Sequence, residues 1–286
     1  MQLKEKLVSL DEAADVINDG DSIGIGGASL VYKPMAVIRE IIRHKIKNLK
    51  VYTLMGDIDL DMLIGAGCTK CVYVGYVGFP MMGMAPNFRR AAENGQIEVK
   101  EYSELTFCLG LRAAYMGVPF FPTHSLLGSD LLKVRDDFKV FDCPVTNQKL
   151  VAIPAIRPDV ALIHGYQADP YGNVLALERQ IMIDFITSIA KSANKTIVSV
   201  EKIISHEEVL QHPEKVILPH YEVDFLVEVP YGAHPSGFLP LYPPDVTHLA
   251  EYRTAAADPG SFEEYMKKYV YTVKTYEEYL KIAKNI

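Results

Sequence analysis

The sequence has no long apolar run. None of its apolar stretches reaches the roughly 18 residues that a membrane-spanning helix needs, and the charged stretch from Met1 to Lys6 has no apolar segment behind it. A secretory signal peptide has a basic start followed by an apolar core. The sequence therefore predicts neither a spanning helix nor a signal peptide, and we expect a cytoplasmic protein with no membrane partner.

Positive charge is also scarce. The 286 residues include 29 lysines and arginines against 36 aspartates and glutamates, so the formal net charge is −7 at pH 7. Surfaces that bind nucleic acid are usually basic. The one short basic stretch, residues 39–50, has apolar residues at helical spacing, which indicates an ordinary helix with a solvated cationic face. We expect no nucleic-acid partner.

Cysteine is sparse as well, with four residues in the chain. Cys68 and Cys71 form a single C-x-x-C pair, without the second pair or the histidine that a zinc site needs. In a chain of this size, four cysteines are expected to be reduced thiols rather than a disulfide framework. We therefore predict no metal site, and the sequence assigns these two cysteines no role.

What the sequence does contain is a glycine loop between a short buried strand and a helix. Residues 19–34 have the pattern of a turn, a strand, a bend at Gly26 and Gly27, and a helix that opens at Pro34, where the missing N–H costs nothing. Glycine lets the backbone come close to a ligand, and amides near the start of a helix point outward. The loop is therefore predicted to bind an anion or an oxyanion.

Two nucleotide-binding motifs are absent from this loop. A dinucleotide fingerprint has the spacing G-x-G-x-x-G, but Ser29 stands at the third glycine position after Gly24 and Gly26, and no acidic residue follows about 20 residues later. A P-loop is excluded because no Gly-Lys-Ser/Thr sequence follows. An ordinary strand-to-helix turn without a ligand stays open as an alternative.

Strands and helices alternate along the rest of the chain. The patterns predict strands at residues 49–55, 70–77, 97–102, 150–155, 160–166, 196–201 and 223–229, and helices at residues 10–17, 34–44, 61–66, 87–94, 104–116 and 179–193. Such alternation predicts an α/β fold, a largely parallel open sheet with helices on both faces. We find no linker or internal repeat. We therefore expect residues 1–286 to form a single domain with a peripheral helical C-terminal part from about residue 252.

Residues 19–34 resemble the signature of the α subunit of family I CoA-transferases, which has an acid-glycine pair, three apolar residues, a Gly-Gly pair and a closing proline. Ala28 stands where that family often has phenylalanine, and Tyr32 where it often has a further glycine. The segment ends in Tyr32-Lys33-Pro34, and this ending is similar to that of the glutaconate CoA-transferase branch of the family. Further matches extend over nearly the whole chain: Gly117-Val118-Pro119-Phe120-Phe121-Pro122, residues 164–173, Val200-Glu201-Lys202-Ile203-Ile204, and Pro230-Tyr231-Gly232-Ala233-His234-Pro235.

The resemblance implies an enzyme that moves coenzyme A between an acyl-CoA and a small carboxylate, with coenzyme A as a substrate and no further cofactor. In this family the thioester is attacked by a glutamate of the β subunit, so this chain would be the α subunit of a hetero-oligomer of αβ pairs. Each step creates an oxyanion, which the backbone amides of Gly26, Gly27 and Ala28 are predicted to bind. We expect Ser29 and Tyr32 of the same loop to contact the substrate.

Two further residues are candidate substrate contacts. Arg112, on the predicted helix 104–116, is suited to pair with a substrate carboxylate, although a structural salt bridge is the more common role for an arginine. His234 follows the last predicted strand in a loop that contains glycine, a position that often borders a ligand cleft in α/β proteins. A histidine without a mapped partner is also often a structural hydrogen-bonding residue.

Glu104 marks an alternative function. It follows the capping residue Ser103 at the start of a predicted helix, where the helix dipole stabilises a charged carboxylate, so it would be a poor base unless it is desolvated. The segment also resembles the α subunit of a ring-opening CoA-thioester hydrolase of steroid-ring catabolism, in which a glutamate at this place is the catalytic base.

A third alternative is a non-catalytic effector-binding module of the same broad fold. The absence of a helix-turn-helix or a basic arm counts against it. The sequence identifies neither the acyl group nor the acceptor acid, and it leaves the number of αβ pairs open.

Overall fold

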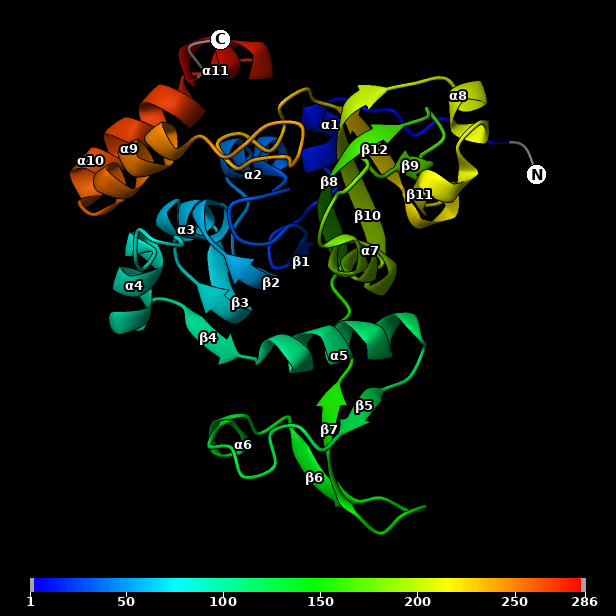
Figure 1. The fold of residues 1–286 in the computed structure, drawn as a ribbon. Helices are drawn as coiled ribbons and strands as arrows, with labels where there is room; N and C mark the ends of the chain where they lie inside the picture. Colours follow the sequence, from blue (N-terminus) through cyan, green and yellow to red (C-terminus); the bar gives the residue numbers. More distant parts are fainter. Residues whose placement is uncertain (1–2, 284–286) are drawn as a thin grey trace.

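The computed structural model describes residues 3–283 (Figure 1), and its centre is a nine-stranded sheet. The strands of this sheet are β1 (Ser22–Ile25), β2 (Leu49–Gly56), β3 (Thr69–Val77), β4 (Glu98–Glu101), β8 (Val160–Ala168), β9 (Val174–Leu175), β10 (Lys195–Ile203), β11 (Val216–Leu218) and β12 (Phe225–Glu228). The helices are α1 (Leu10–Ala14), α2 (Met35–Arg43), α3 (Ile58–Gly65), α4 (Pro86–Glu93), α5 (Glu104–Tyr115), α6 (Leu131–Val134), α7 (Ile183–Ser192), α8 (His206–Leu210), α9 (Val246–Ala256), α10 (Pro259–Met266) and α11 (Tyr276–Ala283). The predicted α/β class is confirmed.

The parallel strands are arranged around a reversal of order. β1 pairs with β2, β2 with β3 and β3 with β4 on one side, while β8, β10 and β12 follow on the other side of β1, all in parallel. β9 pairs antiparallel with the carboxyl end of β8, and β11 pairs antiparallel with β9. In open α/β sheets, ligands bind outside the carboxyl ends of the strands where the order reverses. Here that point lies between β1 and β8, and the glycine loop leaves the carboxyl end of β1.

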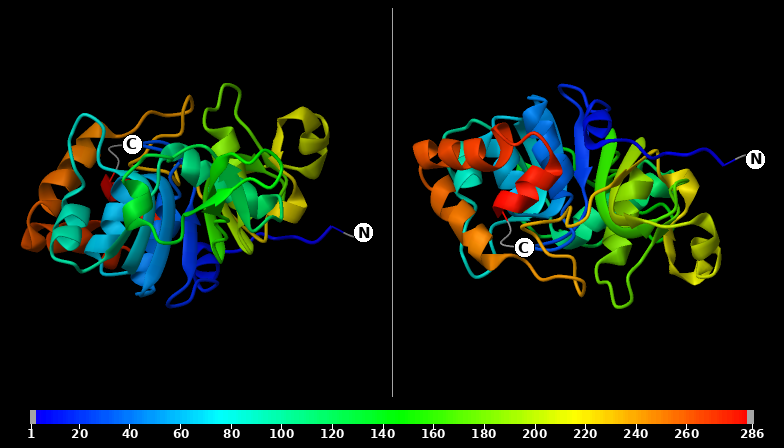
Figure 2. Two further views of the ribbon diagram at one scale, coloured as in Figure 1. Left: turned by 90° about the horizontal axis from the view of Figure 1, so that it is seen from below. Right: turned by 90° about the horizontal axis from the view of Figure 1, so that it is seen from above.

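Each face of the sheet has its own apolar core. Side chains of α1, α2, α3, α9 and α10 pack with Ile23 and Ile25 of β1 in one core, and those of α5 and α7 pack on the opposite face (Figure 2). Since successive residues of a strand face opposite sides, Gly24 faces α7. A Cβ on Gly24 would lie 2.9 Å from Cγ1 of Ile189, so the glycine allows α7 to pack closely against β1.

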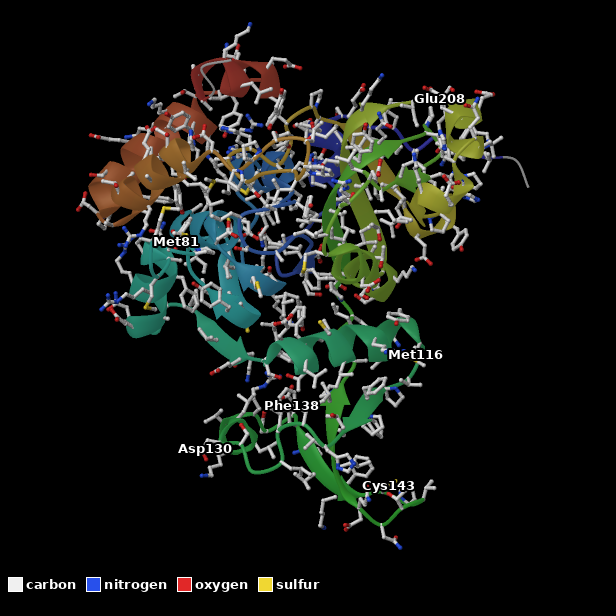
Figure 3. The ribbon with its side chains drawn as sticks, viewed as in Figure 1. Met81, Met116, Asp130, Phe138, Cys143 and Glu208 are labelled. Atoms are coloured by element: carbon white, nitrogen blue, oxygen red, sulfur yellow. The ribbon has the colours of Figure 1, made fainter. Side chains whose placement is uncertain are left out.

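A second, smaller sheet forms an arm below α5 (Figure 1). Its strands are β5 (Phe120–Thr123), β6 (Lys139–Asp142) and β7 (Lys149–Pro154), which pair antiparallel in the order β5-β7-β6. Figure 3 shows Phe138 where the arm meets α5; its ring lies 5.4 Å from that of Tyr102. The predicted strand at residues 150–155 therefore exists, but the expectation that it continues the main alternating pattern was wrong.

Local signals account for most helix starts. The Ser103 hydroxyl accepts a hydrogen bond from the Thr106 amide (3.2 Å), and α5 begins at Glu104 as expected. The Ser9 hydroxyl caps α1 in the same way, accepting from the Glu12 amide. The short helix expected at 61–66 begins earlier, at Ile58, because the Asp57 carboxylate accepts the Ile58 amide (2.7 Å).

The C-terminal part is helical, as predicted, but it is not peripheral. Tyr252, Tyr265 and Met266 are buried, and they belong to the core that covers α2 and α3. Helix α9 already begins at Val246, before the predicted boundary. Within residues 3–283, no helix combines the length and the apolar character needed to cross a bilayer.

Candidate functional site

The glycine loop begins where β1 parts from β8. The Gly26 amide still donates to the Leu162 carbonyl oxygen (2.9 Å), and the next residue, Gly27, has φ +81°. A Cβ on Gly27 would lie 2.6 Å from the Tyr32 carbonyl oxygen, closer than real Cβ contacts allow. Backbone conformation and the packing of the loop on itself both require glycine at this position.

Hydrogen bonds within the chain use two of the three predicted oxyanion donors. The Gly26 amide binds Leu162, and the Ala28 amide donates to the Val31 carbonyl (3.2 Å), while the Val31 amide returns a bond to Ala28 (3.3 Å). Of the three amides, only that of Gly27 has no acceptor among residues 3–283, so Gly27 alone stays a predicted oxyanion donor.

Tyr32 occupies a conformation that favours glycine. Its φ is +61°, which gives a physical reason for a glycine at this position in similar loops. Its side chain is fully buried, with the ring 5.0 Å from that of Phe238, and its hydroxyl donates to the Leu239 carbonyl (2.8 Å). The ring therefore lies in the core, and the predicted substrate contact of Tyr32 is corrected. Ser29, half-buried with φ +52°, stays a predicted contact.

A cavity of about 740 Å³ lies between α5 and α7. Glu104, Cys108 and Arg112 line it at spacings of four residues, which places them on one face of α5. Asp184 and Lys191 of α7 line the opposite side. The structure thus brings the two sequence candidates Glu104 and Arg112 into one groove, together with Cys108, whose thiol pKa is raised by burial and by the nearby Glu104.

A hydrogen bond joins the glycine loop to the segment before α7 that lines the groove. The Ile181 amide donates to the Tyr32 hydroxyl (3.4 Å), and Met182 and Ile183, which follow directly, line the groove. Both exposed cationic groups of the groove are available to an anion, since neither Arg112 nor Lys191 forms an ion pair in the described part of the chain. The guanidinium of Arg112 lies 5.9 Å from the ring centroid of Phe121.

A buried polar cluster at the ends of β8 and β10 was not predicted. The His164 ring contacts the Ser199 hydroxyl through Nδ1 (2.8 Å) and the Glu201 carboxylate through Nε2 (2.7 Å). Burial raises the pKa of Glu201, but hydrogen bonds from His164, the Tyr242 hydroxyl and the Tyr231 amide outweigh it and hold that pKa below its usual range. His164 and Glu201 belong to the motifs at 164–173 and 200–204, which were the available sequence signal. Because Ser199 and His164 are fully buried, we assign the cluster a structural role.

His234 lies in the core rather than in a cleft. Its Nδ1 contacts the Tyr279 hydroxyl (2.7 Å) and its Nε2 the Asp245 carboxylate (3.1 Å), and only 2% of its surface is exposed. Burial and the charge of Arg39 lower its pKa to about 3, so the ring is neutral at pH 7. This position corrects the predicted substrate contact of His234.

The cysteine pair is buried and free, and burial raises the pKa of both Cys68 and Cys71 to about 11, so both are thiols at pH 7. Elsewhere, Asp11, Glu40 and His44 bring one possible metal-ligand atom each within 4.8 Å of one another. His44 Nε2 lies 2.9 Å from the Asp11 carboxylate there, so hydrogen bonding within the chain already accounts for this surface group.

Comparisons with known proteins identify the family and the fold of this chain. Residues 7–229 match the family model described as Coenzyme A transferase. The A subunit of glutaconate CoA-transferase from Acidaminococcus fermentans is 34% identical over 293 residues, which cover 96% of this chain and 91% of that protein. The crystal structure of glutaconate coenzyme A-transferase from the same organism superposes with a TM-score of 0.91 and 33% identity, covering 96% of this chain and 92% of that chain.

Two other relatives cover nearly the whole chain. The IpdA subunit of the cholesterol ring-cleaving hydrolase of Rhodococcus jostii is 32% identical over 276 residues, 93% of this chain and 92% of that protein. An uncharacterized protein of Archaeoglobus fulgidus is 34% identical over 99% of this chain, and the chain spans only 63% of that protein's length.

Proposed function

This chain belongs to the coenzyme A transferase family, and from that membership we propose that it is the α subunit of an acyl-CoA:carboxylate CoA-transferase of the glutaconate type. The similar chain of glutaconate CoA-transferase is itself one subunit of that enzyme. We therefore propose a cytoplasmic hetero-oligomer of αβ pairs. Its substrates are an acyl-CoA and a small carboxylate, coenzyme A is the group transferred, and no separate cofactor takes part.

The proposed reaction proceeds through the partner's glutamate. Its carboxylate adds to the thioester carbonyl and expels the coenzyme A thiolate, which leaves a mixed anhydride between enzyme and acyl group. The thiolate then attacks the glutamyl carbon, releases the first acid and forms a glutamyl-CoA thioester. The second carboxylate reverses these steps. Each addition places negative charge on a carbonyl oxygen, where one preorganised amide is worth about 3 to 4 kcal/mol.

One observation carries the proposal: the Gly27 amide lies at the reversal point of the sheet and has no acceptor among residues 3–283. We propose that this amide binds the oxyanion and that Ser29 contacts the substrate beside it. The adjoining groove offers Arg112 to a substrate carboxylate. A charge-assisted pair of this kind suits an acyl group that carries a second carboxylate.

Co-expression with the β subunit tests this function. The complex, incubated with an acyl-CoA in the absence of an acceptor acid, is expected to accumulate a thioester on the β subunit that borohydride reduces, and labelled coenzyme A should pass to an added carboxylate. The isolated chain is expected to be inactive. Full turnover by this chain alone, or the lack of any thioester on the partner, would contradict the proposal.

A second function, hydrolysis of a cyclic CoA thioester, is favoured by one observation. Glu104 lies in the groove with the cationic Arg112, and the IpdA subunit of the ring-cleaving hydrolase is 32% identical to this chain. In that reaction Glu104 would act as a base towards water or an acidic C–H. The variant Glu104→Gln distinguishes the two functions, because only the hydrolase needs Glu104 as a base. The transferase proposal expects CoA transfer within about threefold of the unsubstituted complex, whereas loss of a general base costs about 10²- to 10⁴-fold.

A further inference from the structure

Lys33 is a buried cation at the end of the glycine loop. It is the second residue before α2, and none of its surface is exposed. Its Nζ lies 2.9 Å from Oδ2 of Asp59, which is also fully buried, and it donates a hydrogen bond to the Met55 carbonyl oxygen (2.6 Å). The ammonium thus joins the end of the loop to the end of β2 and the first turn of α3.

A third buried acidic group, Asp57, adjoins this ion pair. Asp57 is fully buried, and burial raises its pKa well above its usual range in spite of the attraction of Lys33. The ion pair itself is formed by Asp59, whose Oδ2 is the carboxylate oxygen 2.9 Å from the Lys33 Nζ. The Asp59 carboxylate also accepts the Asp57 amide at Oδ1 (2.8 Å), so the ion pair is attached to the backbone where β2 ends.

The glycine loop needs contacts with other segments of the chain to keep its backbone conformation. Between Gly26 and Lys33 it contains three residues with positive φ, namely Gly27, Ser29 and Tyr32. Left-handed conformations of non-glycine residues cost roughly 1 kcal/mol each or more and persist only where the surroundings hold them. The middle of the loop is held by bonds between Tyr32 and Gly237 (2.7 Å) and between Gly237 and Leu30 (2.8 Å). Lys33 attaches the end of the loop to β2 and α3, through the Met55 carbonyl and the Asp59 carboxylate.

We propose that Lys33 is a positioning residue: through Asp59 and the Met55 carbonyl it holds the glycine loop against the end of β2, so that the Gly27 amide faces the reacting carbonyl. This inference rests on the proposed function. Stability alone does not explain the pair, because replacing a buried ion pair with uncharged side chains is often neutral or stabilising. A shift of about 1 Å in a group that binds the transition state can cost about 10²-fold in rate.

The test uses the double variant Lys33→Met with Asp59→Asn, in the αβ complex. Removing both charges avoids an unpaired buried carboxylate, which would destabilise the fold strongly. We expect an unfolding midpoint close to that of the unsubstituted chain, a fall in kcat of about 10- to 100-fold, and a KM within about twofold. Hydrogen exchange of peptides that cover residues 26–32 should become faster, while exchange in β10 should not change.

The matched control removes an ion pair of the same charges from the surface. Lys149 and Asp142, 2.8 Å apart and both 63% exposed, belong to the arm. Lys149→Met with Asp142→Asn should alter neither the rate nor the exchange of the loop. If the Lys33 variant keeps its full kcat, or loses activity while the exchange of residues 26–32 stays unchanged, the positioning role is overturned.

The exchange experiment also separates this inference from the proposed function. Should the unsubstituted complex show no CoA transfer, the proposed function fails, and the exchange of the loop in the double variant still decides the role of Lys33. Faster exchange confined to residues 26–32 supports positioning, and unchanged exchange overturns it.

Discussion

At the scale of single residues, two of the three left-handed positions of the loop differ in their consequences. Gly27 and Tyr32 both have positive φ, but only Gly27 lacks room for a Cβ. Tyr32 keeps its conformation because its ring is buried against Phe238 and its hydroxyl is hydrogen bonded at Leu239. A side chain that packs well can therefore replace glycine at one of these positions and not at the other.

Gly27→Ala tests this difference. The new methyl group would meet the Tyr32 carbonyl at 2.6 Å, so the loop has to move and the amide loses its orientation. We expect CoA transfer by the αβ complex to fall at least about 10²-fold, and the unfolding midpoint of the chain to fall as well.

Gly128→Ala is the control, because Gly128 has nearly the same φ (+82°) but no atom within 4 Å of the place where a Cβ would lie. It carries the same conformational cost without a clash. Equal losses of activity in the two variants would contradict the assignment of the Gly27 amide.

At the scale of elements, α5 presents its groove-lining residues only if its first turn is formed. The Ser103 hydroxyl accepts the Thr106 amide, and the Thr106 hydroxyl in turn accepts the Ser103 amide (3.0 Å). Glu104 is the first residue after this cap. The shape of the groove near Glu104 therefore depends on this capping interaction as well as on the packing of α5 against α7.

Ser103→Ala is expected to lower the free energy of unfolding by about 1 kcal/mol, as is usual for the loss of an N-cap, and to raise KM for the acyl-CoA because the first turn of α5 loosens. Urea unfolding and steady-state kinetics measure the two effects.

Ser205→Ala is the control for this prediction. Ser205 caps α8 in the same way, accepting the Glu208 amide (3.2 Å), and no residue of α8 lines the groove. A rise in KM with Ser205→Ala as large as that with Ser103→Ala would show that the effect is not local to α5.

At the scale of the whole molecule, one buried carboxyl joins three helices. Asp61 of α3 accepts the Phe88 amide of α4 (2.8 Å) and the Tyr252 hydroxyl of α9 (2.7 Å). Burial raises the pKa of Asp61 to about 6, although these hydrogen bonds favour its charged form. The folded protein therefore binds this proton more tightly than the unfolded chain, and this group makes stability fall as pH rises from about 4 to 6.

Tyr252→Phe removes a donor to the charged form of Asp61, which raises that pKa further. The loss of stability should therefore be larger above pH 6 than below it. We expect about 2 to 3 kcal/mol at pH 8, as for a hydrogen bond to a charged group, and about 1 kcal/mol at pH 5, where the carboxyl is protonated. Urea unfolding at the two pH values measures the difference.

Tyr265→Phe is the control here, because its hydroxyl contacts His248 (2.6 Å), whose pKa is lowered to about 4 by burial and by Arg39. That ring is neutral at both pH values, so the cost should be the same at both. A pH-independent loss for Tyr252→Phe would contradict the raised pKa of Asp61.

The sequence by itself determined most elements of the main sheet and the need for glycine in the loop. Residue periodicity and capping residues act over a few positions, so α5, β2 and β3 were predicted to within one residue at each end. The same local signals identified the loop between β1 and α2, and they predicted the α/β class because strands and helices alternate.

Only the tertiary structure decided which groups of the site are free. The Gly26 amide donates a hydrogen bond to the Leu162 carbonyl, and the Tyr32 ring packs against Phe238. The His234 ring contacts the Tyr279 hydroxyl and the Asp245 carboxylate. Each of these partners is distant in the sequence or lies on another element. Likewise, the pairing of Lys33 with Asp59 depends on β1 and β2 lying side by side. Hydrogen bonding and burial are set by contacts between distant segments, and these arise when the sheet assembles rather than from any local pattern of residues.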